Sequence, residues 1–152
     1  MNGGKTEEEL YSMLETGYAR RCLFGYSRES NKRIDLTPDE VYDLMTNKAS
    51  NAVLKSMSDH LEQMADMTNM NRKLIMQKPT SLLLIEYKLA CEKIAHALPE
   101  HEEIKKAEIS HRYFKALKLA GAYAFIDDSM ELTEEHLYNA IKLVEESGAA
   151  FN

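Results

Sequence analysis

Five basic residues gather near the N-terminus of the chain, and only one acidic residue, Glu29, lies among them. The five are Arg20, Arg21, Arg28, Lys32 and Arg33. Because the planar guanidinium group of arginine matches the oxygens of a phosphate, the cluster predicts a phosphate contact. The phosphate would belong to a nucleotide or to a nucleic acid, for which Arg28, Lys32 and Arg33 are the candidate contacts. The alternative is a surface patch that forms ion pairs with acidic helices.

The first residues contain a second phosphate-like signature, Gly3-Gly4-Lys5-Thr6. A phosphate-binding loop of the type G-x-x-x-x-G-K-[ST] needs a strand before it and a first glycine five residues ahead of the Gly-Lys pair. The sequence before Gly4 offers neither. The stretch instead predicts a flexible lead into a short helix, with Thr6 as its N-cap and Glu9 completing a capping box.

Metal and hydrolytic chemistry are poorly supported. Glu108 and His111 have the E-x-x-H spacing that places both on one helix face, but a helical di-metal site needs a second such pair and two further glutamates. The chain has no second pair, no H-E-x-x-H and no G-x-S-x-G. We therefore expect no metal site and no hydrolytic centre.

The composition indicates a single soluble domain. The chain has 152 residues, a net charge of −6 and a pI near 5.4, which argues against a protein that coats nucleic acid by charge alone. Cys22 and Cys91 stand in apolar surroundings and are expected to be free thiols in a reducing compartment. The longest apolar stretch, residues 116–126, is too short to span a bilayer. We expect no membrane partner and a cytoplasmic location, in the host if the gene belongs to a phage.

Hydrophobic periodicity and capping signals predict a mainly α-helical fold, a multi-helix bundle. The clearest start signals are Thr37-Pro38 followed by Glu40, and Thr133. The last helix is expected to turn Leu137, Ala140, Ile141 and Val144 inward. The helices are expected at about 6–16, 38–47, 50–68, 80–98, 102–127 and 133–148.

One or two short strands are expected near the N-terminus. Residues 22–24, Cys-Leu-Phe, form an apolar run between glycines and are the best strand candidate, and residues 72–78 predict a short strand or an extended connector. A lone strand needs neighbours for its backbone hydrogen bonds. We therefore expect either a dimer paired through residues 21–26 or a sheet supplied by other sequence.

Two segments together resemble the C-terminal part of phage and mobile-element primase–helicase proteins, which are P-loop ATPases of the AAA+ type. The segments are residues 17–27, GYARRCLFGYS, and residues 107–148, which end in the pattern LTEEHLYNAIKL. They resemble more distantly the end of hexameric motor domains such as minichromosome-maintenance helicases. In these proteins an arginine-bearing segment leads into the last core strand, and a helical lid follows. Residues 35–100 match only in being helical.

The resemblance implies a role for each matching residue. Arg20 or Arg21 would be the arginine finger that reaches the nucleotide of a neighbouring subunit. Arg112, or alternatively Lys115, would be a phosphate sensor on the lid. Residues 1–34 would be the last helix and strand of an incomplete P-loop core, and residues 35–152 the lid domain.

The resemblance also implies that this chain would not bind or hydrolyse ATP alone. The sequence has no Walker A loop and no Walker B strand, so ATP and Mg²⁺ would be bound by the parent assembly. We expect a terminal piece or a split gene product of a larger protein. Its partners would be the remainder of the ATPase core or neighbouring subunits, with DNA contacted through the assembly. Two rivals remain open: a non-catalytic helical interaction protein, with a homodimer as one form of it, and a helical DNA-binding module.

Overall fold

The computed structural model describes residues 3–25 and 36–150, with the backbone alone for residues 48–50. Of the described residues, 77% are helical, as the sequence predicted. The chain divides into two compact units, residues 1–26 with 73–152, and residues 27–72, and each is described by itself. None of the described helices is long and apolar enough to cross a membrane. The division predicted from the resemblance, into a P-loop core piece over residues 1–34 and a lid domain over residues 35–152, stays a prediction.

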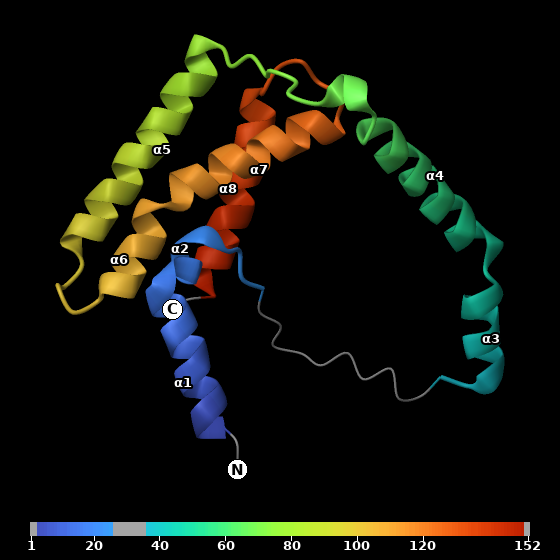
Figure 1. Ribbon diagram of the computed structural model, residues 1–152, viewed down its shortest axis with the longest axis horizontal. Coiled ribbons are helices and arrows are strands. Elements are labelled where there is room, and N and C mark those ends of the chain that lie inside the picture. The colour runs from blue at the N-terminus through green and yellow to red at the C-terminus, as the bar shows by residue number, and fades with distance from the viewer. Residues whose placement is uncertain (1–2, 26–35, 151–152) are drawn as a thin grey trace. The chain divides into compact units, whose positions relative to one another are not determined.

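Four helices form the core of the first unit, in which α7 packs against α8 and crosses it (Figure 1). Small side chains at Ala116, Ala120 and Ala124 of α7 let the two helices approach closely, and all three are fully buried. Leu137, Ala140 and Val144 of α8 are buried against them, and Ile141 is packed at the edge, which confirms the predicted inward face. The four helices are α5 (Lys78–Ala97), α6 (Glu103–Ser110), α7 (Arg112–Ile126) and α8 (Glu134–Ala149).

The single helix predicted over residues 102–127 is interrupted at His111. Helix α6 ends at Ser110 and α7 begins at Arg112, and the backbone of His111 leaves helical geometry with φ −97° and ψ 0°. The His111 ring compensates by bonding through Nδ1 to the Ala107 carbonyl, 3.0 Å away. The sequence therefore located the helical residues correctly but missed the bend between α6 and α7.

The N-terminal helix begins earlier than predicted, and its helical geometry breaks at Gly17, next to the predicted end at residue 16. Helix α1 runs over Gly3–Met13, so Thr6 lies inside it rather than capping it. The turn η1 (Leu14–Tyr18) follows and contains a kink at Gly17, after which the short helix α2 (Ala19–Arg21) begins. Gly17 takes a left-handed φ of +105°, which suits glycine and redirects the chain between the two helices.

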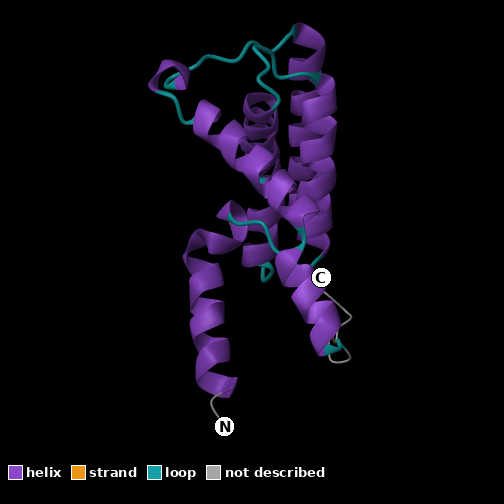
Figure 2. Ribbon diagram, turned by 90° about the vertical axis from the view of Figure 1, so that its right-hand side faces the viewer, coloured by secondary structure: helices purple, strands orange, loops and turns teal. Residues whose placement is uncertain are grey.

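The strand predicted at residues 22–24 does not form. Residues 22–25 leave α2 in an extended conformation, but they join no β-ladder within the described part of the chain (Figure 2). The reason is tertiary: the Phe24 amide donates to the side chain of Ser147 on α8, at 2.6 Å, instead of to a neighbouring strand. Residues 72–78 likewise act as a connector, whose one β-type contact is an isolated parallel bridge between Ile75 and Glu131.

Helix α8 starts at the predicted cap. Thr133 accepts a hydrogen bond from the His136 amide, and the Thr133 amide donates to Nδ1 of His136, at 3.1 Å. Because Nδ1 accepts this bond, the ring proton sits on Nε2, which donates to Asp127 at 2.7 Å. The cap thus fixes both the start of α8 and the turn that precedes it.

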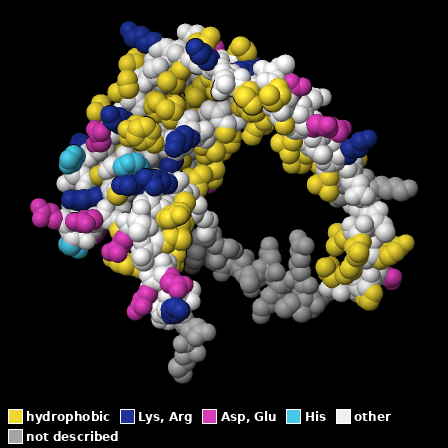
Figure 3. Space-filling model, in the orientation of Figure 1, with side chains coloured by type: hydrophobic (Ala, Val, Ile, Leu, Met, Phe, Trp, Pro, Cys, Tyr) yellow, Lys and Arg dark blue, Asp and Glu magenta, His cyan; other side chains and the backbone are white. Residues whose placement is uncertain are grey.

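The second unit consists of α3 (Pro38–Thr46), α4 (Lys48–Met64) and a single 3₁₀ turn, η2 (Met67–Asn69). The predicted capping box of Thr37 and Glu40 is present, with Pro38 in the first helical turn. Large apolar side chains remain exposed along both helices, as Figure 3 shows. On α3 and α4 they are Val41, Tyr42, Leu44, Met45, Val53, Leu54, Met57 and Leu61.

Candidate functional site

The arginine pair lies on the short helix α2, which packs on α6. Ala19 is buried at the start of α2, Arg20 is half-buried and Arg21 is exposed. Two backbone contacts fix this segment to the bundle: the Ala19 carbonyl accepts from Lys115, and the Phe24 amide donates to Ser147. The arginines are therefore held between two anchors, one on each side in the sequence.

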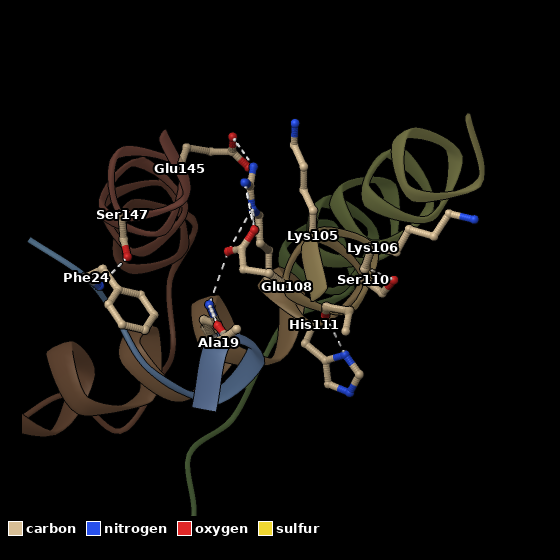
Figure 4. A network of polar contacts seen from close by, with 12 residues as sticks. Ala19, Phe24, Lys105, Lys106, Glu108, Ser110, His111, Glu145 and Ser147 are labelled. Carbon is tan, nitrogen blue, oxygen red and sulfur yellow. Dashed lines mark hydrogen bonds and ion pairs between the residues drawn. The ribbon is translucent and has the colours of Figure 1, made fainter. Parts of the chain in front are cut away.

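The first anchor is a hydrogen bond from Lys115, which also forms a buried ion pair with Glu108. Lys115 on α7 donates through Nζ to the Ala19 carbonyl at 3.1 Å and to Oε1 of Glu108 at 3.2 Å (Figure 4). Lys115 is 8% exposed and Glu108 only 1%. A buried carboxylate needs both a counter-charge and hydrogen bonds to offset the loss of its hydration. Lys115 supplies part of this and at the same time binds α2.

Arg112 supplies the remaining counter-charge and hydrogen bonds of the Glu108 carboxylate. Its Nε lies 3.1 and 3.0 Å from the two carboxylate oxygens of Glu108, and Nη2 lies 2.9 Å from Oε2. Its Nη1 reaches Glu145 on α8 at 3.0 Å. The guanidinium is buried, which opposes its charge, but the hydrogen bonds and attraction of Glu108 and Glu145 outweigh this and raise the pKa of Arg112. Glu108, Arg112 and Lys115 form a buried network, which Arg112 extends to the exposed carboxylate of Glu145, and these contacts together join α2, α6, α7 and α8.

Tyr87 on α5 extends the buried network to a further helix. Its hydroxyl donates to Oε1 of Glu145 at 2.6 Å. Burial, and then the bond to Glu145, raise the pKa of Tyr87 far above its ordinary value of 10.0. Burial also raises the pKa of the neighbouring Cys91 thiol from 9.0. Cys91 is a buried free cysteine, as predicted, and Cys22 is a free cysteine that is partly buried.

Gly148 on α8 leaves the space in which the Arg112 guanidinium lies. A methyl group added at Gly148 would collide with the Nη2, Cζ and Nε atoms of Arg112. Gly148 and the neighbouring Ser147 are both buried. The last turn of α8 thus contributes two adjacent contacts: Ser147 binds the extended segment, and Gly148 admits the cation of the network.

The structure brings together some of the predicted site residues and separates others. Arg112 and Lys115, the candidate phosphate sensors, both bind Glu108 in this conformation. Glu108 and His111 do not form a paired site, because their side chains bind different partners. Among the described residues no cluster of three potential ligands could hold a metal ion. Three further candidates, Arg28, Lys32 and Arg33, lie outside the described residues.

Sequence reasoning missed the central role of Glu108. Its spacing gave a usable signal, since Arg112 follows four residues later and Lys115 seven residues later, close to one helix face. The contact to the Ala19 carbonyl left no such signal, because it joins residues 96 positions apart. Comparison of the sequence with protein-family models, curated proteins and solved structures finds no match, so the function is argued from this geometry.

Replacing Glu108 by glutamine should strongly destabilise the fold. The change leaves the buried Lys115 without a counter-charge and removes the main partner of Arg112. We expect the free energy of unfolding to fall by about 3–5 kcal/mol, measured by urea denaturation with circular dichroism. The matched control is Glu103→Gln, an exposed position on the same helix, where a change within about 0.5 kcal/mol is expected. Equal effects at both positions would contradict the network.

Two glycine-to-alanine changes should act in opposite directions. Gly148→Ala forces the Arg112 guanidinium away from Glu108 and should cost about 1–3 kcal/mol of stability. Gly121→Ala on α7 meets Leu74 at an ordinary 3.9 Å and should stabilise by up to about 1 kcal/mol, because alanine favours the helix. Thermal unfolding of the two variants measures the difference, and a gain at Gly148 would be inconsistent with the close approach.

The chain should lose stability in alkali. Tyr87 and Cys91 both have raised pKa values in the folded state, so the unfolded chain releases these protons first, above about pH 9 for the thiol and 10 for the phenol. Stability is fully present below this range and falls as the pH rises, by up to about 1.4 kcal/mol per pH unit for each group. Tyr87→Phe should flatten the decline between pH 9.5 and 11, roughly the window of the phenol. Tyr138→Phe, at a residue 57% exposed, should leave it unchanged.

Proposed function

We propose that this chain is a C-terminal part or a subunit of a phage-type replicative helicase or primase–helicase ATPase. In this proposal it presents an arginine finger to the nucleotide of a neighbouring subunit and contributes a helical lid. The observation that supports it most directly is the anchoring of α2. The backbone carbonyl just before the arginine pair is bound by the buried Lys115, while the Arg21 side chain remains exposed.

An arginine finger needs this combination of a fixed backbone and a free head group. The guanidinium must meet charge that develops on the γ-phosphate, and a preorganised donor avoids the cost of reorienting during the reaction. Arg21 satisfies the requirement, because its side chain is exposed and makes no ion pair within the described part of the chain. Arg20 is half-buried against Gly17. We therefore assign the finger to Arg21.

The roles of the lid residues are adjusted to the contacts observed. Arg112 and Lys115 both neutralise Glu108, so they support the finger through the backbone rather than by meeting a phosphate in this conformation. A sensor role would require either residue to exchange Glu108 for a phosphate. ATP and Mg²⁺ would be held by the rest of the assembly, with DNA contacted through it.

A second candidate is a non-catalytic helical interaction protein. The observation in its favour is the second unit, where large apolar side chains of α3 and α4 remain exposed. Exposed apolar patches of this kind are typical of protein–protein contacts. Both candidates therefore place this chain in a larger assembly, and they differ in whether the assembly hydrolyses ATP.

The test is an ATPase measurement on the complete assembly. The nucleotide sequence around this gene should carry a Walker A motif, in frame or in an adjacent gene, and the product is then combined with this chain. Arg21→Ala should lower kcat by about 10³-fold and leave nucleotide affinity unchanged, because the finger acts on the transition state. Arg21→Lys should not restore kcat fully, since lysine lacks the planar fork.

The control is Lys118→Ala, which removes an exposed positive charge from α7 and should leave kcat unchanged. Unchanged turnover in Arg21→Ala, with the ATPase active, would refute the finger assignment. A gene neighbourhood without any P-loop ATPase, together with a stable self-association of the isolated chain in sedimentation, would favour the interaction protein instead.

A further inference from the structure

The first unit contains a cavity of about 750 Å³ beside the arginine pair. It is bounded by the end of α1 and η1 on one side and by the start of α6 on the other. Tyr11, Leu14, Ile104 and Ala107 supply apolar parts of its wall, and Arg20 supplies a guanidinium. Its volume falls within the range of about 300–1,000 Å³ that is typical of small-molecule sites, and its lining is more charged than that of most such sites.

Arg20 is turned toward this cavity by the left-handed glycine beside it. Its guanidinium lies across Gly17, where a methyl group would stand 3.1 Å from both Nε and Nη2. Gly17 at φ +105° therefore makes room for the side chain. Arg20 is half-buried, yet it makes no hydrogen bond or ion pair with any described residue. A partly desolvated cation without a partner is unfavourable, and an anion in the cavity would relieve this.

Acidic residues line the same cavity and limit the charge that it accepts. They are Glu15, Glu102 and Glu103. Glu102 lies 3.7 Å from Lys105, so these two charges largely compensate each other. Glu15 and Glu103 are exposed, and neither reaches Arg20. Their two carboxylates repel anions, but both lie in solvent, which screens this repulsion. The cavity can therefore accept at most one anionic group, at Arg20, and disfavours a polyphosphate.

We propose that this cavity binds a small organic oxyanion, one carboxylate or phosphate group joined to an apolar body. The guanidinium of Arg20 binds the oxyanion, and Tyr11, Leu14 and Ile104 contact the apolar body. The site does not include Arg21. It stands independently of the proposed function, because it uses Arg20 within its own chain and leaves Arg21 to the neighbouring subunit.

The test is an NMR titration of the full ¹⁵N-labelled chain with phenyl phosphate, benzoate and the neutral phenol. At least one anionic probe should shift the amide signals of Leu14, Gly17 and Ile104 saturably, and phenol should not. The stronger of the two anions identifies the preferred oxyanion. Arg20→Gln should weaken that binding about tenfold or more, the loss expected for one charge-assisted contact.

Two further variants complete the test. Arg21→Gln removes the same charge one residue later and should leave probe affinity within about twofold, since Arg21 does not line the cavity. Ala107→Leu keeps every charge but fills the cavity wall and should reduce binding of both anions. If circular dichroism shows that Arg20→Gln does not fold, the result with Ala107→Leu decides the outcome. Equal binding of phenol, full binding by Ala107→Leu, or no saturable shift with either anion would overturn the proposal.

Discussion

The carboxylate of Glu108 is the interaction on which the first unit depends. At 1% exposure it has lost its water, and an unpaired charge there would be too costly for a domain of this size to tolerate. Arg112 and Lys115, both on α7, compensate for the lost hydration of this carboxylate. Arg112 also binds Glu145 on α8, and Lys115 also binds the carbonyl of Ala19. One buried charge therefore determines how α2, α7 and α8 meet α6. Apolar packing between α7 and α8 alone would not specify where the N-terminal segment attaches.

The same network explains why the expected strand is absent. Residues 22–25 have the apolar composition of a buried strand, but the chain on either side of them is already bound to helices. The Ala19 carbonyl is bound by Lys115 before the segment, and within it Phe24 is bound by Ser147. An extended backbone with these partners does not need a sheet among the described residues, because part of its hydrogen bonding is met by side chains. The arginines are positioned by these two contacts, which we call the clamp on α2, rather than by a β-ladder.

Most features set by neighbouring residues were predictable from the sequence, and features set by distant ones were not. The caps at Thr37 and Thr133 were predicted because each depends on residues three positions apart, whereas the cap predicted in the same way at Thr6 was wrong, since α1 already begins at Gly3. The inward face of α8 followed from its 3.6-residue period. The bend at His111 was missed, since the helix pattern continues through it and only packing against the other helices decides where it breaks. The clamp on α2 and the place of Gly148 beside Arg112 were missed for the same reason.

The two neighbouring arginines are therefore not interchangeable. Consecutive residues on a helix point about 100° apart, so a backbone that turns Arg20 over Gly17 necessarily turns Arg21 away from it. Because the clamp on α2 fixes the backbone, neither side chain can take the place of the other without breaking the buried network. A cation that faces a cavity of its own chain can bind only what enters that cavity. A cation that faces solvent from a rigid backbone can reach a second molecule. The physical consequence is one basic pair with two separate environments, one internal and one available to a partner.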